Sequence, residues 1–347
     1  MRLRHLAIML GAGLAGAGCS AIHQGDPAVA VTASAETVVA DNPRVDADDP
    51  AIWASPDNPS RGVIFATDKT LGLYVHNLDG SVKSFFPVGP LNNVDLRAGF
   101  VVNGKSWVLV AATERQRFGI ETFLLDPDTL ETHHWGFIKT DMGEPYGFCM
   151  GVAGGRYYLL PNDKDGAIRQ IEILPGANGP VGSVVRSLEL GSQTEGCVVD
   201  DERGEFYIGE EDVAVWRYRF DPGAGDERTR IASADGHRLV ADIEGMSILH
   251  DGTRKYLIVS SQGDSTYAVF DISTDQANYR GRFHIVDGIV DGTSATDGVD
   301  AFSGPIGNFP DGLVVVHDDH DSPSRLGQNF KLVDWRNIRS ALKLDAR

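Results

Sequence analysis

The feature that most constrains the fold is a unit of two short apolar strands around a polar turn, which occurs six times along the chain. The six units span residues 62–78, 107–125, 156–173, 205–218, 256–270 and 313–335. In each unit the turn is rich in charged or amide side chains. A period of about 45 to 57 residues, with three or four strands per copy, is typical of propeller blades. The sequence therefore predicts an all-β fold, a six-bladed β-propeller.

A second repeated feature precedes each unit, namely polar or acidic residues at the start of another short strand. These strand starts lie at residues 48–53, 92–96, 144–148, 194–198, 242–246 and 297–302. The offset from strand start to turn varies little, from 20 residues between Asp49 and Lys69 to 16 between Glu195 and Glu211. In an antiparallel arrangement, such a strand start lies at the same end as the turn of the next pair. We therefore expect all twelve segments to meet at one end of the ring.

The charge of the chain limits its partners. The sequence holds 31 Lys and Arg against 49 Asp and Glu, a net charge of −18. Nucleic acids and anionic lipid surfaces are bound through clustered Lys and Arg, so we expect neither as a partner. Carboxylate oxygens are instead the ligands that Ca²⁺ prefers. The expected protein is a monomer that binds a small molecule.

The residues expected at the shared end divide into a basic half and an acidic half. The first three turns contribute the cations Lys69, Arg115 and Lys164, and the last three contribute Glu211, Gln262 and Asp318. The strand starts add Asp48, Asp49, Glu195, Asp242 and Glu244. Crowded carboxylates cannot all stay ionised without cations, so the set predicts several Ca²⁺ ions, with phosphate oxygens held by Lys and Arg. For any single Asp, capping of a tight turn remains an alternative.

Four of the acidic residues are followed directly by glycine. The pairs are Glu195-Gly196, Glu244-Gly245, Asp291-Gly292 and Asp297-Gly298. Because glycine lacks a Cβ atom, we interpret these pairs as backbone that a ligand approaches closely.

Sequence motifs of several other catalytic classes are absent. The chain holds no H-E-x-x-H, no G-x-x-x-x-G-K-[ST], no G-x-S-x-G and no Arg-His-Gly-x-Arg. Phosphoryl chemistry at this end would therefore have to use a water activated by a metal ion.

The N-terminus has the pattern of an export signal. Two arginines precede an apolar run, residues 6–15, that is too short for a transmembrane helix. Small residues then precede Cys19, as in a bacterial lipobox, although ordinary cleavage nearby is the alternative. We expect residues 1–18 to be a lipoprotein-type signal peptide, 19–35 a flexible tether and 36–347 the propeller domain. The protein would be a periplasmic or outer-membrane lipoprotein, or secreted, with lipid on Cys19 as its only membrane contact.

The cysteine count agrees with export. If Cys19 is lipidated, Cys149 and Cys197 remain as an even pair. In an oxidising compartment such a pair can form a disulfide, and both residues lie near the starts of strands in adjacent blades. Two buried free thiols are the alternative.

Eight sequence blocks together resemble the β-propeller phytases, the alkaline, calcium-dependent 3-phytase family. The blocks are Asp48-Asp49-Pro50-Ala51-Ile52-Trp53, Leu91-Asn92-Asn93-Val94-Asp95-Leu96-Arg97, Gln193-Thr194-Glu195-Gly196, Asp242-Ile243-Glu244-Gly245, Ser260-Ser261-Gln262-Gly263, Asp291-Gly292-Thr293-Ser294, Asp297-Gly298-Val299-Asp300 and Asn329-Phe330-Lys331-Leu332-Val333. The resemblance runs from about Glu36 to the C-terminus. It implies a phosphoric monoester hydrolase that needs Ca²⁺ and converts phytate, bound as its calcium complex, stepwise to lower inositol phosphates.

The resemblance also implies roles for individual residues. Calcium ligands fall on Glu36, Asp48, Asp49, Glu195, Glu211, Asp242, Glu244, Gln262, Asp291 and Asp318. Residues that bind substrate phosphates fall on Lys69, Arg115, Tyr146 and Lys164, and these four with Glu211 form the implied catalytic set. The implied reaction is in-line attack of water, without a covalent phospho-enzyme. The chain departs from the family at Thr70, where a second Lys is usual, and in a more acidic turn around Asp318.

Two other classes of function remain open at this point. A calcium-dependent lactonase-type propeller would use a single deep metal ion and would leave Lys69, Arg115 and Lys164 without a role. A non-catalytic surface propeller could bind inositol phosphates or a protein. Release of inorganic phosphate from phytate in the presence of calcium separates the three classes.

Overall fold

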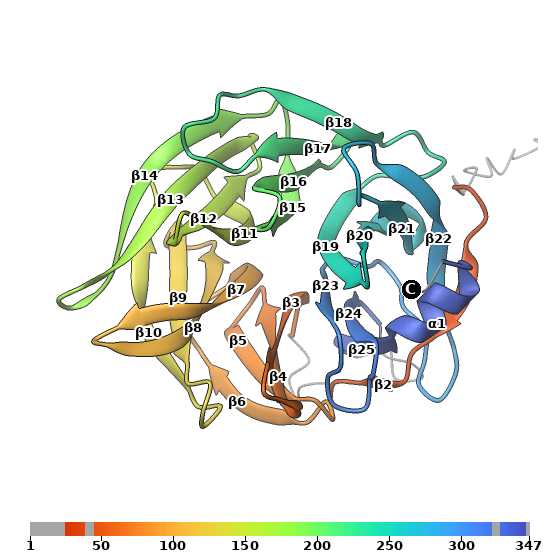
Figure 1. Ribbon diagram of the computed structural model, residues 1–347, viewed down its shortest axis with the longest axis horizontal. Coiled ribbons are helices and arrows are strands. Elements are labelled where there is room, and N and C mark those ends of the chain that lie inside the picture. Colours follow the sequence, from red (N-terminus) through yellow and green to blue (C-terminus); the bar gives the residue numbers. More distant parts are fainter. Residues whose placement is uncertain (1–24, 39–44, 321–326, 345–347) are drawn as a thin grey trace, which may run out of the picture.

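The computed structural model describes residues 25–38, 45–320 and 327–344. Within these residues, six sheets stand around a central axis and one short α-helix, α1 (Trp335–Ala341), follows the last strand (Figure 1). The predicted six-bladed β-propeller is therefore confirmed. The expected signal peptide, 1–18, and Cys19 lie outside the described residues. In the described part of the chain, no helix has the length and hydropathy that a membrane span requires.

The first four blades are each formed by four consecutive antiparallel strands. Blade 1 contains β3 (Ala47–Ser55), β4 (Asn58–Asp68), β5 (Gly72–Asn77) and β6 (Val82–Phe86). Blade 2 contains β7 (Leu91–Val102), β8 (Lys105–Glu114), β9 (Gly119–Leu125) and β10 (Thr132–Lys139). Blade 3 contains β11 (Pro145–Ala153), β12 (Arg156–Asp163), β13 (Ala167–Gly176) and β14 (Gly179–Glu189). Blade 4 contains β15 (Thr194–Asp200), β16 (Glu205–Glu210), β17 (Ala214–Arg219) and β18 (Arg228–Ser233).

The last two blades each include a strand from the N-terminal part of the chain. Blade 5 contains β19 (Ile243–Asp251), β20 (Arg254–Ser261), β21 (Thr266–Asp271), β22 (Asn278–Val286) and β1 (Val29–Thr32). Blade 6 contains β23 (Val299–Ser303), β24 (Gly312–Asp318), β25 (Asn329–Asp334) and β2 (Ala35–Glu36). Because β2 pairs with β25, chain segments from the two ends share one sheet and close the ring (Figure 1).

The N-terminal strands correct part of the prediction that residues 19–35 form a flexible tether. Residues 29–32 form β1, which pairs in parallel with β22, and the Val31 side chain is buried in the core of blades 5 and 6. This pairing satisfies backbone N–H and C=O groups on the outer edge of β22, and burial of Val31 adds hydrophobic stabilisation. The prediction of a flexible tether is therefore wrong for residues 29–32.

Hydrophobic clusters between the blades hold the ring together. Trp53 and Phe65 of blade 1, for example, pack against Val110 and Phe123 of blade 2. A blade in a ring has a neighbour on each of its faces, so its inner strands are apolar on both sides. This explains why β8 is buried without interruption from Val108 to Glu114 instead of alternating.

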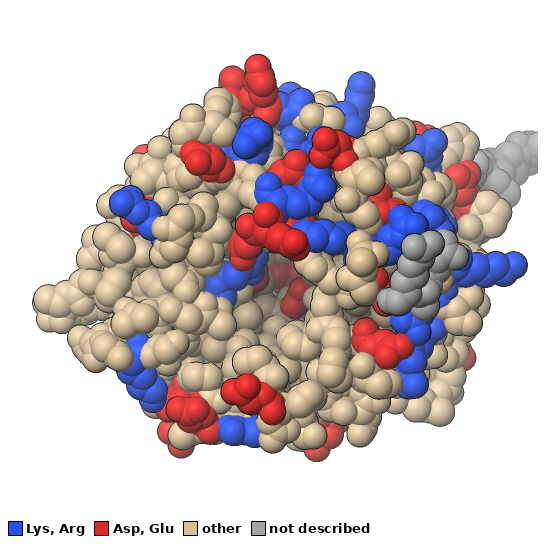
Figure 2. Space-filling model, viewed as in Figure 1, with Lys and Arg blue, Asp and Glu red and all other residues tan. Residues whose placement is uncertain are grey.

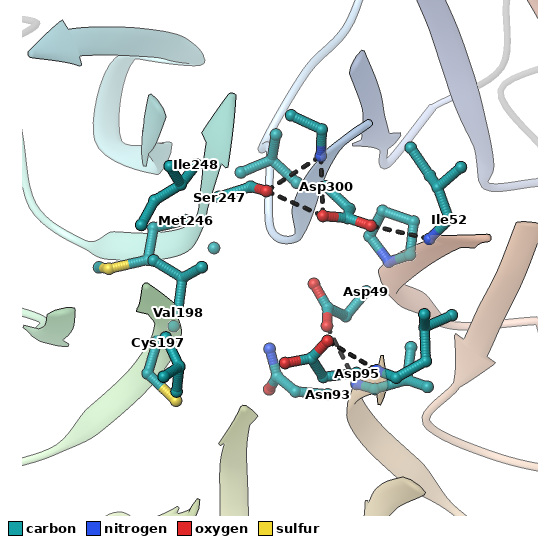
Figure 3. A pocket seen from close by; sticks show the side chains of 18 of the residues that line it. Asp49, Ile52, Asn93, Asp95, Cys197, Val198, Met246, Ser247, Ile248 and Asp300 are labelled. Carbon is teal, nitrogen blue, oxygen red and sulfur yellow. Dashed lines mark hydrogen bonds between the residues drawn. The ribbon is translucent and has the colours of Figure 1, made fainter. Parts of the chain in front are cut away.

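Around the axis, buried and half-buried carboxylates on the innermost strands join neighbouring blades (Figure 3). In each case a backbone N–H of the next blade donates to a carboxylate oxygen: Val94 to Asp49 (3.0 Å), Met150 to Asp95 (2.9 Å) and Ile52 to Asp300 (2.7 Å). The three carboxylates line a cavity of about 390 Å³. These bonds fix the mutual position of blades 6, 1, 2 and 3, whose innermost strands share no sheet.

Candidate active site

The strand starts and the turns meet at one end of the ring, as predicted. In the strand registers, Ala47 is paired with Asp68, Leu91 with Glu114, Pro145 with Asp163, Thr194 with Glu210 and Ile243 with Ser261. We call this end the turn face. Strand β25 starts at the turn face and ends at the opposite face, where helix α1 follows it. Because α1 lies toward the viewer in Figure 1, the same view in Figure 2 shows the face opposite to the turn face. The centre of that opposite face is hollowed and shows acidic side chains (Figure 2).

A β-bulge at the same place in five blades directs the predicted site residues toward the axis. The register of the innermost strand shifts by one residue between Ala47 and Pro50, Leu91 and Val94, Pro145 and Phe148, Thr194 and Cys197, and Ile243 and Met246. Asp48, Asp49, Tyr146, Glu195 and Glu244 all lie within these bulges. Bulges re-aim side chains near active sites, and here five copies bring polar side chains together.

The glycine that follows each acid packs closely against other protein atoms. A Cβ atom on Gly196 would lie 2.1 Å from the Glu244 carbonyl oxygen, and one on Gly245 would lie 2.6 Å from the Val299 nitrogen. For Gly298 the nearest atom is Asp49 Oδ1 at 2.3 Å, and for Gly292 it is the Ile285 carbonyl oxygen at 2.5 Å. These protein contacts by themselves require glycine at the four positions, and the interpretation of the glycines as ligand contacts stays a prediction. In three of them the close approach is that of the neighbouring blade.

Three glutamates form the centre of the acidic half. One carboxylate oxygen from each of Glu195, Glu211 and Glu244 lies within 4.8 Å of the others, and all three residues are buried. Asn92 Nδ2 donates to Glu195 Oε1 over 2.7 Å, and Gln193 Nε2 donates to both Glu211 oxygens over 2.8 and 2.9 Å. These neutral amides orient the carboxylates without neutralising their charge.

The electrostatics of this cluster favour a bound cation. Burial and the Asp48 charge raise the pKa of Glu195 to about 8. Burial raises the pKa of Glu211 to about 7 against the hydrogen bond from Gln193, and burial with the Glu195 charge raises that of Glu244 strongly. Each shift records a negative charge that the surroundings do not stabilise. A divalent cation among these oxygens would reverse that penalty.

The donor set also fits calcium in its chemistry. Every candidate ligand offers oxygen, and Asp48 Oδ2 and Glu244 Oε2 are buried without a hydrogen-bond partner. Buried polar atoms normally have partners, so two unpaired carboxylate oxygens on one face point to a cation that binds there.

Lys69 lies at the border between the acidic and basic halves. Its ammonium donates to Asp48 Oδ1 over 3.0 Å and to Asp297 Oδ2 over 2.8 Å. Gln262 Nε2 donates to the other oxygen of Asp297. The carboxylates of Asp48 and Asp297 outweigh the effect of burial and raise the pKa of Lys69, so it stays charged.

The remaining basic residues gather around Tyr146. The Arg115 guanidinium and the Lys164 ammonium lie 5.3 and 4.6 Å from the centre of its ring, as cation–π contacts. Burial and the nearby Glu195 and Glu244 charges raise the pKa of Tyr146, so the phenol keeps its proton and can donate a hydrogen bond. Arg115 also contacts Glu144, which lies just before β11.

An open groove of about 310 Å³ connects the two halves of the turn face. It is lined by Asp46, Lys69, Tyr146, Gln193, Glu211, Asp242, Glu244, Gln262, Ala295, Asp297 and Asp319. Six of the predicted site residues therefore border one space that a phosphorylated ligand can enter.

Three predicted calcium ligands form a separate cluster at blade 6. Glu36, Asp291 and Asp318 all contact the buried ammonium of Lys331, with Glu36 Oε2 at 2.6 Å and Asp318 Oδ2 at 3.2 Å. Three carboxylates and one ammonium leave an excess of two negative charges, so this cluster can still attract a divalent cation.

Asp49 differs from the other predicted ligands in its position. Its Oδ2 accepts the Val94 N–H, and its side chain lines the axial cavity instead of the groove (Figure 3). Burial and the adjacent Asp48 charge raise its pKa well above the usual range. Asp49 thus faces the axis while Asp48, one residue earlier in the same bulge, faces Lys69.

The two remaining cysteines are bonded to one another. Cys149 on β11 and Cys197 on β15 form a disulfide between adjacent innermost strands, with Cα atoms 5.5 Å apart. Each cysteine lies within three residues of a predicted site residue, Tyr146 or Glu195. The bond therefore ties together two strands that carry the site.

Sequence reasoning gave no role in the site to Glu144, Gln193, Asp297 or Lys331, which contact the predicted set. Asp297-Gly298 was noted only as an acid–glycine pair, although it occupies the place in blade 6 that Glu195-Gly196 and Glu244-Gly245 occupy in theirs. Nothing in the local pattern around Lys331 distinguishes it from an ordinary strand lysine. Its role depends on residues 40 and 295 positions away.

Comparisons with known proteins agree with this arrangement. A curated 3-phytase of Bacillus subtilis (strain 168) is 38% identical over 328 residues, covering 90% of this chain and 85% of that protein. Two crystal structures of BBS1N in complex with ARL6DN, soaked with lead or mercury, match with a TM-score of 0.49 and 13% or 12% identity. They cover 82% and 84% of this chain and 78% of each of theirs. The sequence model of the family described as Phytase matches residues 4–346, and the chain belongs to that family.

Proposed function

We propose that the protein hydrolyses the phosphate monoesters of phytate in a calcium-dependent reaction on the turn face. Membership of the phytase family and the 38% sequence identity to the 3-phytase of Bacillus subtilis support the substrate and the reaction class. One observation carries the assignment to this face: oxygens of Glu195, Glu211 and Glu244 lie within 4.8 Å of one another, and Glu211 and Glu244 border the same groove as Lys69. Anion-binding and cation-binding groups therefore face one ligand.

The acidic half would hold the metal. The ligands are the three glutamates with Asp48, Asp242 and Gln262, and the Glu36, Asp291 and Asp318 cluster supplies a second position at blade 6. Calcium bound there would supply positive charge that favours deprotonation of an attacking water and stabilises the developing charge on the phosphate.

The basic half would bind and orient the substrate. Arg115 offers a fork of N–H donors that suits two phosphate oxygens, and Lys164 adds a charge beside it on the Tyr146 ring. Tyr146 donates a hydrogen bond from its protonated phenol, and Lys69 neutralises phosphate charge next to Asp297. Glu211, the remaining member of the implied catalytic set, would act through the metal ion that it helps to hold.

We also propose that the protein is exported and anchored by lipid on Cys19. The basic and apolar N-terminal pattern supports export. The Cys149–Cys197 disulfide is consistent with an oxidising compartment.

Calcium titration and phosphate release together test the assignment. Glu244→Gln removes one charge from a buried ligand and should weaken calcium binding, measured by calorimetry, by at least about tenfold. Phosphate release from phytate should fall in parallel at limiting calcium. Glu189→Gln, which removes an exposed charge paired with Arg169, is the matched control.

Unchanged calcium affinity in Glu244→Gln would refute the metal assignment to the three glutamates. Failure of the wild-type protein to release phosphate from phytate at any calcium concentration would refute the proposed reaction.

A further inference from the structure

Arg115 and Lys164 share one carboxylate oxygen. Arg115 Nε donates to Glu144 Oε1 over 2.7 Å, its Nη2 lies 2.7 Å from the same atom, and Lys164 Nζ lies 3.4 Å away. A phosphate oxygen bound by these two cations would have to take the same position. An acidic side chain therefore already occupies the place where the proposed function requires a substrate anion.

The two cations do not depend on this carboxylate for their position. Both lie over the Tyr146 ring, which is fixed by the bulge of β11. Arg115 and Lys164 side chains are 24% and 37% exposed, so a ligand can reach them. Displacing Glu144 would thus leave a preformed anion site.

Glu144 differs from the buried carboxylates of the face in being able to move. It belongs to the irregular segment between β10 and β11, and its side chain is 34% exposed, whereas Asp48 is 1% exposed. A carboxylate in this position can rotate into water when a competing anion arrives, because hydration replaces the bonds it loses.

We propose that the carboxylate of Glu144 competes with phosphate for Arg115 and Lys164, and so sets how tightly this site holds a substrate phosphate and the phosphate product. This inference rests on the proposed function, because it assumes that these cations bind a substrate phosphate. A ligand with a single phosphate must displace Glu144 with that contact alone. An inositol with several phosphates gains additional contacts at Lys69 and on the acidic half, so it displaces Glu144 more readily. Glu144 therefore lowers the affinity of this position for every phosphate by a similar factor. Inorganic phosphate, which has no other contact, then occupies the position little and is released, whereas a highly phosphorylated inositol still binds through its other contacts.

Removal of the charge tests the competition. Glu144→Gln keeps the length of the side chain and an oxygen acceptor for Arg115 but removes the negative charge. Inorganic phosphate should bind at least about threefold more tightly to this variant, measured by calorimetry with calcium below the solubility limit of its phosphate. KM for phytate should fall, and inhibition by phosphate should become stronger by a similar factor. Glu189→Gln, which removes a charge from an exposed arginine pair in the same blade, should change none of these values.

Phosphate affinity that is unchanged or weaker in Glu144→Gln would overturn the inference and show that Glu144 only positions Arg115. Arg115→Ala separates this outcome from failure of the proposed site. If Arg115→Ala weakens phosphate binding while Glu144→Gln leaves it unchanged, only the role of Glu144 is wrong. If Arg115→Ala has no effect on phosphate binding, the phosphate site itself is wrongly assigned, and the inference fails with it.

Discussion

The Lys69 ammonium donates to Asp48 Oδ1 over 3.0 Å, so a proposed phosphate-binding cation is paired with a proposed calcium ligand. The Asp48 side chain is 1% exposed, and burial raises its pKa even though the Lys69 charge opposes this. The acidic and basic halves of the turn face are therefore electrostatically coupled. A change in one half alters the charge that the other half experiences.

Arg115 and Lys69 should differ in what their loss does to the fold. Either change to Ala should slow phytate hydrolysis at least about tenfold, because each removes a positive charge from the phosphate. Arg115→Ala should leave stability nearly unchanged, since its partner Glu144 is 34% exposed. Lys69→Ala leaves Asp48 buried without a cation and should lower the free energy of unfolding by about 1–3 kcal/mol in calcium-free buffer. Steady-state kinetics and urea unfolding measure the two effects. Near-normal turnover in both variants would remove them from the site.

Calcium removal should abolish activity and lower stability together. Binding to the native state alone stabilises by about 2.7 kcal/mol per site at a hundredfold excess over Kd. Excess EDTA should therefore lower the Tm and stop phosphate release, and added calcium should restore both. Calcium should act at lower concentration than magnesium, because irregular oxygen sites suit the larger ion. Phosphate release and thermal unfolding that both persist unchanged in EDTA would contradict a calcium mechanism.

In metal-free protein, stability should fall as pH rises from about 7, which lies above the usual histidine pKa of about 6.5, to about 8. The native pKa of Glu211 is raised to about 7 and that of Glu195 to about 8 by burial, above the ordinary value of 4.5. In this window the native state binds more protons than the unfolded state, so unfolding becomes more favourable as pH rises. Urea unfolding in EDTA across this range measures the slope, and Glu195→Gln should reduce it. A flat or rising profile in the wild-type protein would be inconsistent with the buried cluster.

The disulfide should be detectable in mass and in stability. Intact mass should rise by about 2 Da on reduction under denaturing conditions, from the two added protons of Cys149 and Cys197. Breaking the link frees a loop with a sequence separation of 48 residues, which in the chain-entropy model lowers stability by at most about 4 kcal/mol. Cys149→Ser with Cys197→Ser should show a corresponding loss in urea unfolding. A protein whose mass does not respond to reductant contains free thiols instead.

The sequence predicted the six blades because the pattern of each hairpin is local. Two apolar runs around a polar turn, such as 107–112 and 120–125, define a strand pair without any information from distant residues. Antiparallel pairing alone also predicted that the strand starts and the turns lie at the same end of the ring. The segment 29–32 escaped this reasoning, because β1 has no hairpin partner beside it in the chain and pairs with β22.

By itself, the sequence determined the blade count, the strand pairs and which charged residues lie at the turn face, since these depend on alternation and on turns between neighbours. Only the tertiary structure decided which of those residues touch. Lys69 contacts Asp297, which lies 228 residues further along the chain, and Lys331 contacts both Glu36 and Asp291. These contacts exist only because the ring closes. The bulges separate Asp48 from Asp49, directing one toward Lys69 and the other to the axis. Coulomb and desolvation energies depend on distances in space, so closure of the ring, rather than order along the chain, sets the charge balance of the site.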